Sequence, residues 1–142
     1  MGYRVHVVKQ TEKFADIEAF NWKNQEFANL LDDLGCNVCG EEPYERFECQ
    51  KDYFKTAINL IKCYKEKGTV DFPQDELEKF GISKETYEGR IDGGEIDLPW
   101  VDEQLANIND ELGYTIDELL NTMEAFLEAA DPDSDYIIFV AW

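Results

Sequence analysis

The sequence predicts a single α+β domain over residues 1–142, in which a small sheet packs against several helices. Two segments at opposite ends of the chain have the composition of β-strands. Residues 3–9 place Val5 and Val7 on one face, and residues 136–142 are apolar at every position. The residues between them have mainly helical spacing, without the regular strand and helix alternation of a parallel sheet. We therefore expect both end segments in one sheet, with the last strand inside it and covered on both faces.

Two helices are predicted in the first half of the chain. Residues 22–34 and 51–67 both carry apolar side chains three and four positions apart, which is typical of a helix with one buried face. Gly35 and Gly68 follow them, and glycine favours the C-terminal cap position of a helix. Asn21 is the expected N-cap of the first helix.

The second half of the chain contains the clearest helix signal. Thr115 and Glu118 have the spacing of a capping box, in which each side chain accepts a hydrogen bond from an otherwise unpaired backbone amide. The helix that they begin should end at Asp131-Pro132. Before it, Pro99 is placed to start another helix that continues up to Gly113.

Shorter elements are also expected. Pro73 should open a short helix, and Ser83 a further turn. A Gly-Gly pair in the middle of residues 90–97 indicates a hairpin, and residues 44–49 could supply another strand.

The charge of the chain is the most informative part of its composition. The net charge is −19, from 32 acidic and 13 basic residues. All 13 bases lie in residues 1–90, whereas residues 91–142 hold 14 acids and no base. Such a field attracts a basic partner and repels nucleic acid. We therefore expect a basic protein partner and no direct binding of nucleic acid.

The cysteines offer an alternative site. Cys36 and Cys39 have the spacing of a zinc knuckle, and Cys49 and Cys63 could complete a four-thiolate site. We favour the simpler hypothesis of four reduced thiols in a cytoplasmic protein without a cofactor. The reason is that the chain shows neither a secretory signal nor widely spread cysteines.

Other functional classes find less support in the sequence. No apolar run is long enough for a membrane span, and no phosphate-binding loop or nucleophile motif is present. An enzyme that uses carboxylate chemistry remains a lesser alternative, since chance pairs of carboxylates are expected among 32 acids. We expect a monomer or a small homo-oligomer.

The leading hypothesis is thus a non-enzymatic acidic protein-binding domain, of the inhibitor or immunity type, whose partner could be a nucleic-acid-binding protein. Aromatic side chains should anchor the interface while carboxylates steer the encounter. The predicted contact residues are Trp100, Asp102, Glu103, Asp110, Glu111, Tyr114, Asp117, Glu124 and Glu128.

Overall fold

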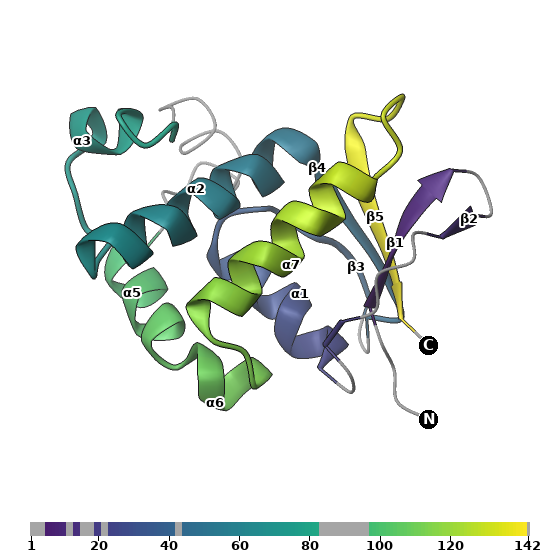
Figure 1. Ribbon diagram of the computed structural model, residues 1–142, viewed down its shortest axis with the longest axis horizontal. Coiled ribbons are helices and arrows are strands. Elements are labelled where there is room, and N and C mark those ends of the chain that lie inside the picture. The colour runs from purple at the N-terminus through teal and green to yellow at the C-terminus, as the bar shows by residue number, and fades with distance from the viewer. Residues whose placement is uncertain are drawn as a thin grey trace.

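The fold is α+β, as predicted, with the helices gathered beside one antiparallel sheet (Figure 1). The computed structural model describes residues 5–10, 13–14, 19–20, 23–41, 44–82 and 97–141. The expected N-cap at Asn21, the turn at Ser83 and residues 90–96 of the expected hairpin lie outside these described residues.

The sheet is formed from both ends of the chain and from its middle. Its strands run in the order β2-β1-β5-β4-β3, and the described pairs are all antiparallel. In chain order they are β1 (Val5–Gln10), β2 (Lys13–Phe14), β3 (Cys39–Gly40), β4 (Arg46–Gln50) and β5 (Tyr136–Ala141).

The helices lie mostly between β4 and β5 in the chain. Those that the structure describes are α1 (Asn24–Asp33), α2 (Lys51–Lys67), α3 (Gln74–Glu78), α5 (Leu98–Ala106), α6 (Ile108–Leu112) and α7 (Ile116–Ala129). None of the described helices is long and apolar enough to cross a membrane.

The last strand occupies the centre of the sheet, as its apolar composition predicted. On one side β5 pairs with β1, where Val7 lies opposite Phe139, and on the other side it pairs with β4, where Phe47 lies opposite the same Phe139. These three side chains form one buried row that faces the helices. The two end segments are therefore direct neighbours.

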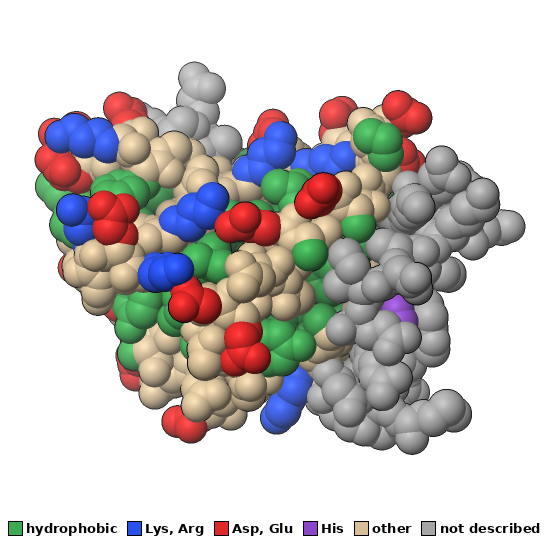
Figure 2. All heavy atoms as spheres, in the orientation of Figure 1, with side chains coloured by type: hydrophobic (Ala, Val, Ile, Leu, Met, Phe, Trp, Pro, Cys, Tyr) green, Lys and Arg blue, Asp and Glu red, His purple; other side chains and the backbone are tan. Residues whose placement is uncertain are grey.

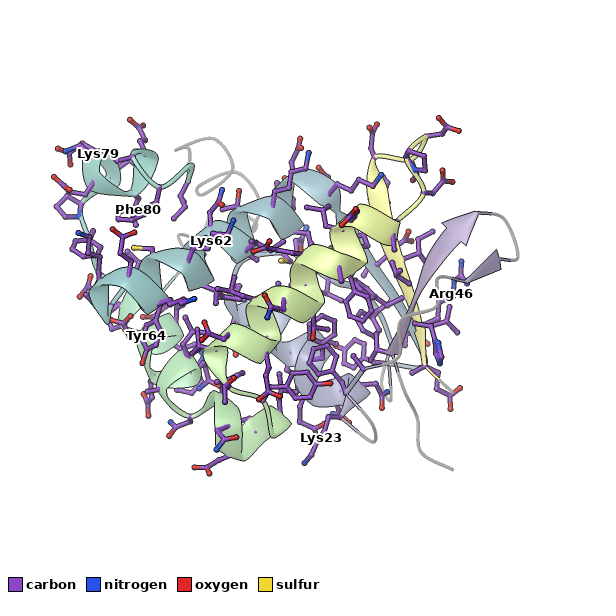
Figure 3. All side chains as sticks on the ribbon, viewed as in Figure 1. Lys23, Arg46, Lys62, Tyr64, Lys79 and Phe80 are labelled. Atoms are coloured by element: carbon purple, nitrogen blue, oxygen red, sulfur yellow. The ribbon has the colours of Figure 1, made fainter. Side chains whose placement is uncertain are left out.

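The expectation that both faces of the last strand are covered was wrong. Its inward side chains, such as Ile137 and Phe139, are fully buried, but Ile138 and Val140 on the other face are only partly buried. The helices pack on a single face of the sheet, and Arg46 of β4 projects from the opposite face (Figure 3). The second face is therefore only half protected from water.

Aromatic rings fill the space between the sheet and the helices. The ring of Phe139 lies 5.5 Å from that of Phe27 in α1, 5.0 Å from Phe47, 5.8 Å from Phe54 in α2 and 5.4 Å from Phe126 in α7. One side chain thus joins three helices to two central strands. Burial of such rings is the main favourable contribution to folding.

The helix ends follow the local signals in the sequence. Gly35 has a φ of 82°, and the amides of Gly35 and Cys36 donate to the carbonyls of Asp32 and Leu31, which is the Schellman pattern that ends α1. The capping box of α7 is confirmed, with Thr115 Oγ1 accepting from the Glu118 amide at 3.1 Å and Glu118 Oε1 accepting from the Thr115 amide at 3.0 Å.

The single helix expected from Pro99 up to Gly113 is instead two helices, α5 and α6. The helical conformation is interrupted at Asn107, which has a φ of −101° and a ψ of 10°. This residue is both the C-cap of α5 and the N-cap of α6. Its side-chain amide donates to the carbonyl of Glu103 at 3.0 Å. Asparagine competes for backbone carbonyls in this way, which disfavours it inside a helix. Both α5 and α6 contact α1.

Candidate functional site

A groove lies between α1 on one side and α5 and α6 on the other. Its volume is about 410 Å³. Helix α1 contacts both α5 and α6 at this place, so the walls of the groove are regular helices rather than loops. The lining residues are Glu26, Asn29, Leu30, Asp32, Asp33, Trp100, Gln104, Ile108, Glu111 and Leu112.

The chemistry of the groove combines carboxylates with an aromatic ring. Trp100 is 44% exposed, which is unusual for a side chain of its size. Four of the lining side chains are acidic, whereas no Lys or Arg of the described residues lines the groove or pairs with those acids. The groove therefore concentrates negative charge without a counter-charge in the described part of the chain.

Two adjacent carboxylates at the end of α1 are partly desolvated. Burial raises the pKa of Asp32, against the opposing effect of the Val38 amide, which donates to its Oδ1 at 2.8 Å. Burial also raises the pKa of Asp33; the hydrogen bond from the Trp100 side chain opposes this rise, and the charge of Asp32 adds to it. Carboxylates with shifted pKa values in a concave site define a candidate functional site.

Glu26 in the first turn of α1 adds a third carboxylate. Its Oε2 atom is buried and accepts no hydrogen bond from any residue that the structure describes. A buried acceptor without a donor costs about 1 to 3 kcal/mol. Glu26 thus contributes a carboxylate oxygen that lacks a hydrogen-bond donor among the described residues.

The acidic face predicted on α7 differs from this groove. Lys62 of α2 forms an ion pair with Glu124 at 3.5 Å, and Lys65 of α2 forms one with Asp117 at 2.5 Å. Basic and acidic side chains accordingly alternate over α2 and α7 in Figure 2, and Figure 3 shows Lys62 on α2 beside α7. Two of the three acids predicted as contacts on α7 are therefore paired, with bases that come from another helix.

Two further predicted contact residues make contacts within the fold. Asp102 accepts a hydrogen bond from Thr69 Oγ1 and another, at 2.7 Å, from the Val70 amide, so it ties α5 to the segment after α2. Tyr114 was expected to be an exposed anchor, but it is partly buried. Its ring lies 4.8 Å from that of Phe20, and its hydroxyl accepts the Phe20 amide hydrogen.

The remaining predicted residues divide between the groove and open surface. Trp100 and Glu111 line the groove. Glu103, Asp110 and Glu128 are exposed and form no ion pair within the described residues. The structure thus brings two of the nine predicted residues together with three acids of α1 that the sequence argument missed.

The four cysteines are not brought together. The Cys49 and Cys36 side chains are buried and hydrogen-bonded to each other, and this bond together with burial raises the pKa of the Cys49 thiol. Cys39 is exposed on β3, while Cys63 is buried in α2 with its Sγ 3.6 Å from the Thr69 carbonyl oxygen. Among the described residues, no three His, Cys, Asp or Glu side chains are arranged to hold a metal ion.

Comparison of the chain with protein-family models, with curated proteins and with solved structures finds no match.

Proposed function

We propose that this protein is a non-enzymatic acidic binding domain, of the inhibitor or immunity type, which binds a basic protein through the groove between α1, α5 and α6. The observation that carries the proposal is the presence of four acidic side chains and an exposed indole in one groove without a described counter-charge. Interfaces of this kind gain affinity from aromatic anchors and specificity from complementary charge.

The net charge of −19 supports the same partner class. A strong field of one sign accelerates association with an oppositely charged protein, and this effect weakens as salt shortens the Debye length to about 8 Å at physiological ionic strength. Proteins that bind nucleic acid present Lys and Arg to phosphates, and a row of carboxylates can occupy such a surface. The partner proposed is therefore basic, and it could be a nucleic-acid-binding protein.

Unpaired carboxylates should contribute more to binding than paired ones. Asp117 and Glu124 already interact with lysines of α2, so a basic partner would have to compete with Lys65 and Lys62 for them. The groove acids have no such competitor among the described residues. The groove, rather than α7, is thus the proposed contact surface.

The test compares two pairs of charge-neutral substitutions in a pull-down from cell lysate at low salt, followed by a wash at moderate salt. Asp33→Asn with Glu111→Gln removes two groove charges, and Asp117→Asn with Glu124→Gln removes two charges from α7. Both variants have the same net charge. We expect the groove variant to lose a salt-sensitive basic partner and the α7 variant to retain it.

Equal loss in the two variants would show that only the total charge matters and would contradict the groove as the site. A partner that resists the salt wash, or no partner for the unmodified protein, would contradict the electrostatic argument as a whole.

A further inference from the structure

The groove is chemically suited to one kind of cationic side chain. Leu30, Ile108 and Leu112 give it an apolar component, Asn29 and Gln104 add amides, and the carboxylates lie around them. An apolar stem with a charged head can satisfy both kinds of surface at once. An organic cation also suits the site better than a bare metal ion, since no three potential ligands converge in the described part of the chain.

We propose that the groove receives an arginine side chain of the partner, in preference to lysine. This inference rests on the proposed function, and it specifies which group of the basic partner enters the groove. Its structural basis is that Glu26, the Asp33 carboxylate and the exposed Trp100 ring all line one groove.

The number and direction of donors favour arginine. Its guanidinium presents five N–H groups in a flat fork, which can donate to more than one carboxylate at the same time. The acids that line the groove lie on both walls, with Glu26 and Asp33 on α1 and Glu111 on α6. The lysine ammonium has three donors at a single point and would leave more of these acceptors unpaired.

The indole of Trp100 favours the same choice. Its side chain donates a hydrogen bond to Asp33, and 44% of the residue is exposed. A guanidinium stacks on aromatic faces and is less strongly hydrated than an ammonium. Moving a guanidinium from water into this partly buried site, where burial raises the pKa of Asp32 and Asp33, therefore costs less free energy than moving an ammonium.

The experiment titrates the full-length protein with two blocked tripeptides that differ only in a central Arg or Lys. Binding is followed by NMR through the indole N–H signals, and the signal of Trp100 is identified by its absence in Trp100→Phe. We expect the Arg peptide to shift this signal and to bind at least about tenfold more tightly than the Lys peptide.

Charge-neutral variants locate the contact. Glu26→Gln and Asp33→Asn should each weaken binding of the Arg peptide, whereas Glu124→Gln on α7 is the matched control and should not. Circular dichroism of each variant checks that the fold is retained, and Glu26→Gln keeps the test available if Trp100→Phe does not fold.

Equal affinity for the two peptides, or an Arg effect that Glu124→Gln weakens as much as Glu26→Gln does, would overturn the arginine inference. If the pull-down partner still depends on the groove in that case, the proposed function stands without it. Conversely, selective Arg binding supports the inference even if the pull-down yields no partner.

Discussion

The two acidic surfaces of the molecule, the groove and α7, differ in their electrostatic environments. On α7, Asp117 and Glu124 lie against lysines of α2, so their charges are compensated locally. In the groove, Asp32 and Asp33 lie against helices that supply an indole and a further acid, and burial raises the pKa of both carboxyls. The difference teaches that the neighbouring helix, and not the composition of a segment, decides whether a run of acids is a compensated surface or an unpaired site.

The largest expected effect concerns the core that both surfaces share. Phe139→Ala should lower the free energy of unfolding by about 3–5 kcal/mol, because it removes a ring that contacts three helices and a neighbouring strand. Urea denaturation followed by circular dichroism measures it. Ile138→Ala is the control on the half-covered face and should cost less. Equal losses for the two variants would show that the helices are not held through Phe139.

A smaller effect is expected from the caps of the helices that carry the two surfaces. Thr115→Ala removes the cap of α7, and Asp97→Ala removes the cap of α5, where Asp97 accepts the Trp100 amide at 3.1 Å. Each should destabilise the protein by about 1 kcal/mol. Only Asp97→Ala should also weaken binding in the groove, which a peptide titration measures. Weakened binding in both variants would mean that the surfaces are not independent.

The ion pairs of α7 should contribute little to stability although they neutralise its surface. Both partners in the pair between Lys62 and Glu124 are about half exposed, and exposed pairs contribute about 0.2–1 kcal/mol. A double-mutant cycle with Lys62→Gln and Glu124→Gln measures the coupling, which should decrease in high salt. A coupling above about 2 kcal/mol would contradict the view that these pairs only compensate charge.

The smallest expected effect is a change in stability on Asp33→Asn, for which the direction of the change is the informative result. Because burial raises the pKa of Asp33 above its ordinary value of 3.8, its charged form makes the folded state less stable at neutral pH. Asp33→Asn keeps an acceptor for the Trp100 side chain, so it should slightly stabilise the protein at pH 7. This gain should disappear as the pH falls below 3.8, where the carboxyl is protonated in both folded and unfolded states. Denaturation midpoints of both proteins across this pH range provide the measurement, and destabilisation by Asp33→Asn at pH 7 would contradict it.

The sequence predicted the features of the fold that depend on local signals. The end of α1 at Gly35 and the start of α7 at Thr115 follow from cap residues that act within one turn. The place of residues 136–141 inside the sheet also followed, because an apolar strand needs neighbours on both sides. The break at Asn107 was missed because apolar spacing continues across it, from Leu105 to Ile108.

The site could be predicted only in part, because its residues come from segments that lie far apart in the sequence. Trp100 and Glu111 belong to the acidic segment that the charge distribution singled out. Glu26, Asp32 and Asp33 belong to the half of the chain that holds all the bases. The composition of that half therefore does not indicate that these three acids lack a basic partner among the described residues. A helical wheel of α1 could have found them as acids beside its apolar stripe, but the groove forms only because α5 and α6 pack against α1.

The central position of β5 has a consequence for synthesis of the chain. Both β1 and β4 pair with this strand, so neither can complete its ladder until residues 136–141 have left the ribosome. During translation the earlier strands therefore present open edges, which are sites of wrong pairing between chains. The acidic residues give nascent chains a common negative charge, and their mutual repulsion opposes such pairing while the last strand is still being made.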